Sequence, residues 1–219
     1  MADQRESGAG YLTPYRDAVR DLGPSFGSLL WKNPEAQARR FEVMIETADL
    51  RGRVVADMGA GLGDLAAQMH RQRIEYGRYI AVEGVDELAA EAQRRLADVP
   101  ETVVMGGDFV SDEKLFGRLV KEQGVEVFAF SGSLNTLEHD DAVRVLERAW
   151  DSVERVRGGQ IVFNFLSDRG RCEGENTGPA HRFETQRLVG WALERTPIIV
   201  LRHDYWEGHD ATIWMRASG

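Results

Sequence analysis

Three alternating glycines stand in the segment VADMGAGLGDL, residues 55–65, between a β-branched apolar run and residues that favour a helix. Gly59, Gly61 and Gly63 predict a tight turn that brings bare backbone N–H groups and a helix N-terminus close to a ligand, an arrangement that suits nucleotides. The spacing differs from the dinucleotide pattern G-x-G-x-x-G, because Asp64 stands where the third glycine would be and is poorly placed beside a pyrophosphate. The turn therefore predicts a nucleotide-like ligand without a pyrophosphate.

Acidic side chains follow the next two apolar runs. Glu83 and Gly84 end YIAVEG, roughly twenty residues after the turn, where a carboxylate can accept hydrogen bonds from ribose hydroxyls. Asp108 and Phe109 follow TVVMG, where the acid offers an acceptor to an adenine amino group and the ring lies beside its face. Ligands of open α/β sheets bind beyond the carboxyl ends of the strands, so we expect these residues to share one site with Ala60 and Asp64 of the turn.

Polar residues with two possible roles accompany the other strands. Asp57 either contacts the ligand or is a buried acid satisfied by backbone N–H groups. Ser131 and Asn135 either contact a ligand or cap the helix that follows. The same alternatives hold for the polar residues near the ends of the fifth and sixth runs, which are Asn164, Ser167, Asp168, Arg169, His203, Asp204 and Tyr205. The catalytic candidates are His203, Asp204 and Asn135. Of these, His203 and Asp204 are either a pair for acid–base catalysis or a solvated polar pair.

The elements that must position these residues alternate along the chain. Apolar runs rich in β-formers alternate with amphipathic stretches, which predicts βα units and a mainly parallel sheet covered on both faces. The predicted strands are VVADM, YIAVEG, TVVMG, VEVFAFSG, QIVFNFL, PIIVLRHD and ATIWMR. Helices are expected between them at about 64–74, 86–97, 112–123, 139–156 and 183–195. Before the first strand, Phe41, Met44, Ile45 and Ala48 have helical spacing and predict a helix packed on the sheet.

The last two strands are separated only by YWEGHD, which is too short for a crossover helix. They are therefore predicted to form an antiparallel hairpin. Its residues Glu207 to Asp210 are typical of a turn, so no metal site is predicted there or elsewhere.

Composition disfavours several classes of partner. The chain has 219 residues and a net charge of -9, which argues against a nucleic acid gripped mainly through its phosphates. Cys172 is the only cysteine, so no intrachain disulfide can form, and a reducing compartment fits best. The segment MADQRESGAG is neither a signal peptide nor a membrane span. We expect a cytoplasmic protein with no membrane partner and make no prediction of its oligomeric state.

Over about residues 36–216, the chain resembles the class I methyltransferases that use S-adenosylmethionine. The resemblance implies their fold: a doubly wound, seven-stranded, mostly parallel sheet with a C-terminal antiparallel hairpin. It also implies that Gly59, Gly61 and Gly63 approach the methionine part of S-adenosylmethionine, that Glu83 takes the ribose and that Asp108 takes the adenine. All three motifs stand at the matching positions.

A finer resemblance comes from the combination QARRF, GAGLGDL, SGSLN, NFLSD and LRHDY, which looks like a bacterial group of methyltransferases of unassigned substrate. In that group an arginine recurs at the position of Arg40, which implies a contact with the cofactor carboxylate. The alternative is that Arg40 belongs to the solvated face of its helix. The resemblance implies no particular acceptor.

The domain organisation follows from these elements. Residues 1–10 are polar and are expected to be disordered. Residues 11–219 are expected to form one domain, with a helical cap over 11–50 and a Rossmann-like core over 51–219. Residues 167–181, rich in turn formers, together with the segment around Tyr11, Tyr15 and Trp31, are expected to close over the acceptor.

The expected acceptor is a small soluble metabolite, held by Asn135, Asn164, Ser167, Asp168, Arg169 and Tyr205 with the candidates His203 and Asp204. Arg169 and His203 favour a carboxylate or another anionic acceptor, and a nitrogen acceptor is the alternative. SGSLN lacks the Asn or Asp followed by two prolines and an aromatic residue that resembling nucleobase-methylating enzymes use. Methylation of nucleic acid or protein, non-catalytic binding of S-adenosylmethionine, and a nicotinamide oxidoreductase stay as alternatives.

Overall fold

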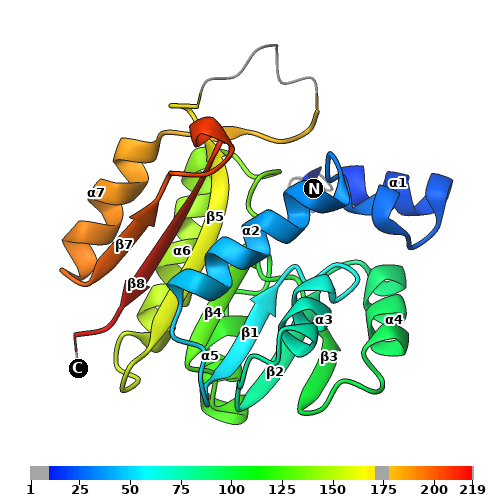
Figure 1. Cartoon of the computed structure of the whole chain (residues 1–219), viewed down its shortest axis with the longest axis horizontal. Helices are drawn as coiled ribbons and strands as arrows, with labels where there is room; N and C mark the ends of the chain where they lie inside the picture. The colour runs from blue at the N-terminus through cyan, green and yellow to red at the C-terminus, as the bar shows by residue number, and fades with distance from the viewer. Residues whose placement is uncertain (1–9, 171–177, 219) are drawn as a thin grey trace, which may run out of the picture.

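One sheet with helices on both faces forms the centre of the molecule (Figure 1). The computed structural model describes residues 10–170 and 178–218. Along the sheet the strand order is β3-β2-β1-β4-β5-β8-β7, and β6 pairs with β5 off this path. The strands are β1 (Val54–Met58), β2 (Arg78–Glu83), β3 (Thr102–Gly106), β4 (Val127–Ser131), β5 (Gln160–Ser167), β6 (Arg182–Phe183), β7 (Ile199–Arg202) and β8 (Asp210–Arg216).

The direction of the strands confirms the predicted fold class. Strands β1 to β5 pair in parallel, and β8 runs antiparallel to both β5 and β7. The predicted hairpin is confirmed, because the 3₁₀ turn η3 (Trp206–Gly208) joins β7 to β8. The two-residue strand β6 was not predicted, because two residues are too few to show an alternating pattern. The sequence had placed Phe183 in the following helix.

The expected helices are all present, and their ends differ from the prediction by a few residues. For example, the helix expected at 112–123 begins at Leu115. Asp112 Oδ1 accepts the backbone N–H of Lys114, and this forms a turn before the helix. The helices outside the N-terminal segment are α2 (Pro34–Thr47), α3 (Asp64–Arg71), α4 (Asp86–Arg95), α5 (Leu115–Gln123), α6 (His139–Val153) and α7 (Thr185–Arg195).

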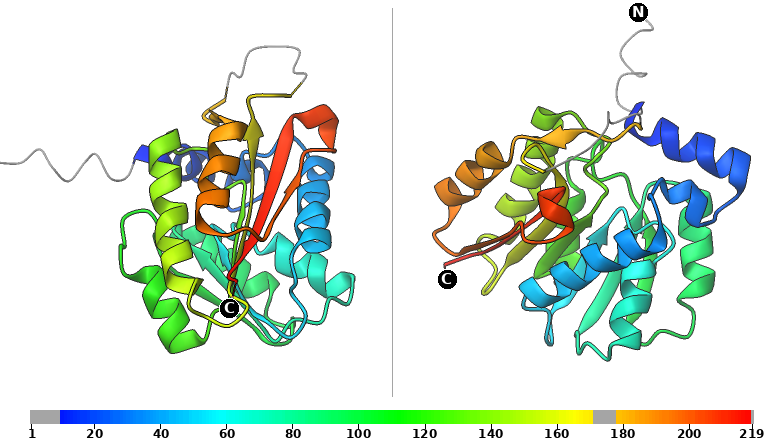
Figure 2. Two further views of the ribbon diagram at one scale, coloured as in Figure 1. Left: turned by 90° about the vertical axis from the view of Figure 1, so that its left-hand side faces the viewer. Right: turned by 45° about the horizontal axis from the view of Figure 1, so that its top comes forward.

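Helices lie on both faces of the sheet (Figure 2), and an apolar cluster fills the space between helices and strands on each face. On one face, Phe41 and Met44 of α2 are buried together with residues of α3, which confirms that this helix packs on the sheet. On the other face, α5, α6 and α7 cover the strands, and Trp150 of α6 is 2% exposed. Burial on both faces explains why the strands are continuous apolar runs rather than alternating ones.

The N-terminal segment lies outside this three-layer core. It comprises η1 (Gly10–Leu12), α1 (Thr13–Leu22) and η2 (Phe26–Leu29), and it packs beside the carboxyl ends of β1 and β2 (Figure 2). A small apolar cluster fastens it there, with the buried members Val19, Leu29, Leu62, Val85 and Leu88. The segment thus stands at the sheet edge where the glycine turn is. Within residues 10–170 and 178–218, no helix has the length and apolar character needed to span a bilayer.

Candidate functional site

The three glycines of the turn after β1 all have left-handed backbone conformations. Their φ angles are 79° for Gly59, 57° for Gly61 and 77° for Gly63. Other residues pay an energetic penalty in this region, so the alternating pattern reflects three successive backbone requirements. The N–H groups of Gly59 and Ala60 both donate to the carbonyl of Val82 in β2, at 2.8 and 3.0 Å. The turn is therefore tied directly to the strand that carries Glu83.

Close packing against side chains is a second reason for all three glycines. A Cβ on Gly63 would stand 2.4 Å from Cδ1 of Leu96, which follows α4. A Cβ on Gly59 would stand 2.5 Å from Cβ of Ser133, and a Cβ on Gly61 would stand 2.8 Å from Cδ2 of Leu29. Leu29 belongs to the N-terminal segment, and Ser133 to the loop after β4. The glycine turn is thus the meeting point of three parts of the chain.

Glu83, at the end of β2, is held by backbone groups on both sides. Its Oε2 accepts the N–H of Gly61 at 2.7 Å, and its Oε1 accepts the N–H of Val85 at 2.9 Å. The side chain is 5% exposed, and burial raises its pKa although these backbone hydrogen bonds act against the rise. The carboxylate is fixed in orientation, and each oxygen keeps capacity for a further donor.

Asp108, after β3, has a similar arrangement. Its Oδ1 accepts the N–H groups of Val110 and Ser111 at 3.0 and 3.2 Å and also the hydroxyl of Tyr11. Partial burial raises the pKa of Asp108, but the hydrogen bonds from Tyr11 and Ser111 prevail and hold it below the usual value. Burial and the neighbouring Asp108 raise the pKa of Tyr11. The N-terminal segment therefore donates one of the hydrogen bonds that orient the Asp108 carboxylate.

Asp57 is a buried acid within β1, as one of the two sequence interpretations held. Its partner is the hydroxyl of Tyr79, which donates to Oδ2 at 2.5 Å, and not a backbone N–H. Burial raises the pKa of Asp57 to about 7, the Tyr79 hydrogen bond lowers it in part, and the charge of Glu83 raises it further. Asp57 also lines the cavity described next, so its contact with a ligand stays a prediction.

A cavity of about 960 Å³ opens at the carboxyl edge of the sheet. Eleven of the residues predicted for the site line it: Arg40, Asp57, Gly59, Ala60, Gly61, Glu83, Gly84, Asp108, Phe109, Ser131 and Asn135. Asp64 does not line it. Its carboxylate accepts Gln37 Nε2 at 3.2 Å and Arg95 at 2.6 Å, which ties α3 to α2 and α4.

The cavity has further walls that lie far apart in sequence. One wall contains Tyr11, Tyr15 and Trp31, from the segment that was expected to close over the acceptor. Burial raises the pKa of Tyr15 to about 12. The sequence indicated no site role for the other polar and aromatic lining residues, which are Lys32, Asn33, Gln37, Phe41, Ser133, Thr136, Arg182, Trp206, Glu207, His209 and Asp210. The central part of the predicted lid, residues 171–177, lies outside the described residues.

Arg40 joins α2 to the hairpin across this cavity. Its guanidinium pairs with Asp210, the first residue of β8, and lies 4.6 Å from the ring centroid of Trp31. Arg40 is 8% exposed, so it does not belong to a solvated helix face. Within the described part of the chain, its Nε is buried and has no hydrogen-bond partner. An unpartnered buried donor beside a cavity is a feature that a bound ligand can satisfy.

Trp31 also approaches the loop after β4. Gly132 has a φ of 72°, and a Cβ there would stand 2.8 Å from Cη2 of Trp31. The backbone N–H of Gly132 donates to Asn164 Oδ1 at 2.8 Å, and Asn164 Nδ2 donates to Ser131 Oγ at 3.0 Å. Asn164 is fully buried and supports this loop from behind; it does not line the cavity.

The other residues predicted for the site after β5 contact the first residues of α7. Ser167 is hydrogen-bonded to the hydroxyl of Thr185 at 2.8 Å, and Asp168 accepts the N–H of Thr185 at 3.0 Å. Arg169 contacts Gln186 at 3.0 Å near the surface. None of the three lines the cavity. Their side chains bind the start of α7, which explains why they are polar at a strand end.

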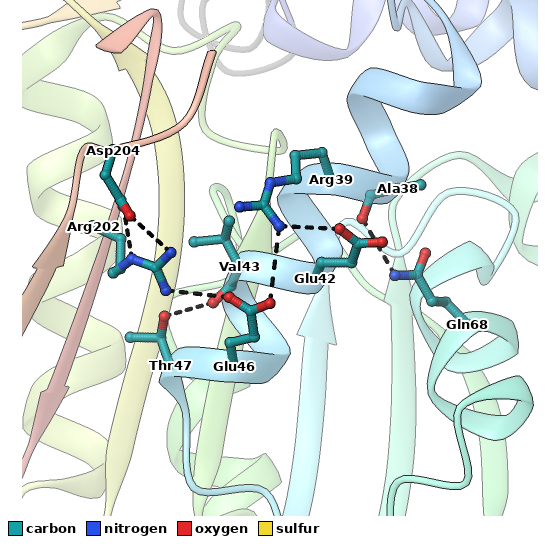
Figure 3. Close-up of polar contacts among 9 residues, drawn as sticks. All are labelled: Ala38, Arg39, Glu42, Val43, Glu46, Thr47, Gln68, Arg202 and Asp204. Atoms are coloured by element: carbon teal, nitrogen blue, oxygen red, sulfur yellow. Dashed lines mark hydrogen bonds and ion pairs between the residues drawn. The ribbon is translucent and has the colours of Figure 1, made fainter. Parts of the chain in front are cut away.

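The catalytic candidates after β7 are likewise away from the cavity wall. His203 Nε2 is 2.9 Å from the carbonyl of Gly208, and the hydroxyl of the buried Tyr205 is 2.7 Å from that of Thr212. Asp204 is exposed and pairs with Arg202 at 2.7 and 3.1 Å, and Arg202 also reaches Glu46 of α2 (Figure 3). β7 is the edge strand of the sheet, so residues that follow it lie farthest from the glycine turn on that side.

Comparison with known proteins identifies the fold. No protein-family model and no curated protein sequence matches the chain. Among solved structures, phosphoethanolamine N-methyltransferase 1 of Haemonchus contortus is 16% identical with a TM-score of 0.63, over 95% of this chain and 49% of that one. The mitomycin 7-O-methyltransferase is 16% identical with a TM-score of 0.61, over 94% and 60%. A small RNA methyltransferase is 12% identical with a TM-score of 0.64, over 87% and 26%.

The chain thus spans about half of the first structure, three fifths of the second and a quarter of the third. These proteins act on different kinds of acceptor, and what they share with this chain is the arrangement of the sheet and its helices. The strand order, with a parallel β3-β2-β1-β4-β5 and a final antiparallel hairpin, is that of the methyltransferases. The chain has the class I methyltransferase fold.

Proposed function

We propose that this protein is an S-adenosylmethionine-dependent methyltransferase whose acceptor is a small organic molecule. The observation that carries the proposal is the convergence of a left-handed glycine turn, Glu83 and Asp108 on one cavity, at three neighbouring strand ends of this fold. Both carboxylates are already oriented by backbone N–H groups. A site with such fixed acceptors binds a polar ligand without having to reorganise.

The residues present fit S-adenosylmethionine. Glu83 would accept the ribose hydroxyls, and Asp108 with Phe109 would hold the adenine. Arg40 would bind the carboxylate of the methionine part, since its Nε is buried without a partner among the described residues. The carboxylates that line the cavity suit a ligand that carries a sulfonium and an ammonium charge.

The chemistry requires alignment more than acid–base catalysis. When bound, S-adenosylmethionine supplies a methyl group on a positively charged sulfur, and an acceptor lone pair takes the methyl carbon as the carbon–sulfur bond electrons return to sulfur. The protein must hold the acceptor in line and exclude water. Leu29, packed on Gly61, and Trp31, packed on Gly132, cover this part of the cavity. Ser131 and Asn135 lie at the end of β4, where the acceptor would meet the methyl group.

A small acceptor is favoured over a macromolecule. A small RNA methyltransferase shares the fold, so the fold alone does not decide between the two classes. The net charge of -9 disfavours a polyanion, and a cavity of about 960 Å³ is at the upper end of the range for small-ligand pockets. This leaves room for a cofactor and a small acceptor together.

Two measurements test the proposal. Calorimetry should show binding of S-adenosylmethionine and S-adenosylhomocysteine, and preferential binding of a nicotinamide dinucleotide would contradict it. Incubation with methyl-labelled S-adenosylmethionine and a metabolite extract should yield a labelled small product. Binding without any transfer would favour a non-catalytic binding protein, and transfer only to RNA or protein would refute the small acceptor.

A further inference from the structure

The turn between β7 and β8 has an unusual backbone. Trp206, Glu207 and Gly208 have φ angles of 48°, 52° and 76°, so three successive residues adopt the left-handed conformation and two of them are not glycine. A side chain strains the backbone in this region, because its Cβ lies too close to the following carbonyl oxygen. Such a turn persists only where its surroundings impose it.

The surroundings of the turn do impose it. The carbonyl of Gly208 is 2.9 Å from His203 Nε2, and the carbonyl of His209 accepts the N–H of Ser167 at 2.9 Å. A Cβ on Gly170 would stand 2.6 Å from the Gly208 oxygen, so the chain after β5 also packs on the turn. His203 is therefore a positioning residue that holds the turn.

The turn presents an aromatic ring and a carboxylate to the cavity. Trp206 and Glu207 both line it, and Trp206 is 47% exposed, whereas Trp150, Trp191 and Trp214 are each below 9%. Among the described residues, Glu207 has no ion-pair partner, although the adjacent Asp210 is paired with both Arg40 and His209. An indole and a free carboxylate thus stand side by side in the sequence at a cavity rim.

Their place in the sheet separates them from Glu83 and Asp108, the predicted ribose and adenine contacts. β8 lies three strands from β1, which carries the glycine turn, and this corresponds to about 14 Å across the sheet. Glu83 and Asp108 lie on the opposite side of β1, after β2 and β3. The turn therefore faces the end of the cavity where an acceptor would bind.

The ionisable groups that line the cavity are predominantly acidic, and at the hairpin end Glu207 is a carboxylate without an ion-pair partner among the described residues. The described lining residues include five carboxylates, Asp57, Glu83, Asp108, Glu207 and Asp210, against three permanent cations, Lys32, Arg40 and Arg182. Arg40 is neutralised by Asp210, and Arg182 donates to the carbonyl of Ser167 at 2.7 Å. Arg169 and His203, which had favoured an anionic acceptor, do not line the cavity.

We propose that Trp206 and Glu207 recognise a positively charged group, such as an ammonium or guanidinium, on the methyl acceptor. An aromatic face and a carboxylate together attract a cation through the ring quadrupole and through charge, and both attractions grow where water is excluded. This inference rests on the proposed methyltransferase function and specifies the class of its acceptor.

The first experiment separates the two proposals. A metabolite extract is divided by ion exchange into cationic, neutral and anionic fractions, and each is incubated with the protein and methyl-labelled S-adenosylmethionine. The expected result is label transfer in the cationic fraction. Transfer only in the neutral or anionic fraction overturns the recognition proposal and leaves the methyltransferase standing. Transfer in no fraction refutes the methyltransferase itself.

The second experiment tests the two side chains with the labelled acceptor as substrate. Glu207→Gln and Trp206→Leu should each lower kcat/KM by about tenfold or more, mainly through KM, while calorimetric affinity for S-adenosylhomocysteine stays within about twofold of the parent. Glu113→Gln, an exposed glutamate before α5, is the matched control and should change neither quantity. Parental kcat/KM in both rim variants would overturn the proposal, and circular dichroism excludes misfolding as the cause of a loss.

Discussion

The two halves of the cavity are built in different ways. In the half after β1, β2 and β3, each polar side chain has a fixed partner: Glu83 is held by two backbone N–H groups, and Asp108 by two more and a tyrosine. In the half after β4 and β5 and before β8, the walls come from segments that meet only in the folded chain. There Trp31 packs on Gly132, and Arg40 pairs with Asp210.

This difference teaches what each half is suited to do. Strand ends and their backbone N–H groups can bind a ligand that every member of a fold shares, because the sheet itself determines the positions of these groups. An acceptor that varies needs walls that can change while the sheet does not. The predictions below test whether the first half is as rigid as described and whether the second is independent of it.

The largest expected effect concerns Asp57. Its pKa of about 7 in the folded protein lies above the ordinary value of 3.8, because burial disfavours the charged form. Between about pH 4 and pH 7 the folded state keeps a proton that the unfolded chain has released, so the contribution of Asp57 to stability is present at low pH and is lost as the pH rises. The full difference corresponds to roughly 4 kcal/mol.

Asn at this position cannot ionise. We therefore expect Asp57→Asn to gain stability relative to the parent as the pH rises from 4 to 8, which urea unfolding of both proteins at several pH values measures. A difference between the two proteins that stays constant with pH would show that Asp57 ionises as easily in the fold as in water.

A smaller effect is expected at the glycine turn. Gly61→Ala should destabilise the protein by about 1–3 kcal/mol, since a left-handed alanine is strained and its Cβ would collide with Leu29. The matched change Gly117→Ala, in helix α5 with open space around it, should stabilise by about 0.5–1 kcal/mol. Thermal unfolding of the two variants checks the opposite signs. Equal effects would mean that the turn is not constrained.

Glu83 should contribute to ligand binding in the first half of the cavity. Glu83→Ala should weaken binding of S-adenosylhomocysteine by about 1–3 kcal/mol, through the loss of charge-assisted hydrogen bonds. Glu126 is a suitable control, because its Oε2 also accepts a backbone N–H, that of Val54 at 3.1 Å, but at the opposite edge of the sheet. Calorimetry should show parental affinity for Glu126→Ala. Equal losses in both variants would attribute the effect to general destabilisation.

The smallest effect is expected at Asp204. Its side chain is 64% exposed and contacts Arg202 at the surface (Figure 3). Although Arg202 lowers the pKa of Asp204, an exposed ion pair contributes little, so Asp204→Ala should change stability by less than about 0.5 kcal/mol and leave methyl transfer unchanged. A marked loss of transfer would restore Asp204 as a catalytic candidate.

The sequence predicted the sheet and the first half of the cavity because their signals are local. The glycine turn, Glu83 and Asp108 each end an apolar run, so their place follows from the strand they terminate. The second half depends on pairs such as Arg40 and Asp210, which are 170 residues apart and give no local pattern. Asn164 and Ser167 illustrate the limit: a polar residue at a strand end has the same sequence signal whether it faces a ligand or fastens a loop.

The insertion of β8 between β5 and β7 has a consequence for the order in which the molecule forms. Because residues 210–216 pair with both neighbours, β5 lacks its partner on that side and β7 has none until this late segment has been made. Contacts of such long sequence separation form slowly, and unpaired strand edges can associate with other chains in the meantime. Slower synthesis or a lower growth temperature should therefore raise the yield of correctly folded protein, and weakened pairing of β8 should first appear as aggregation during production.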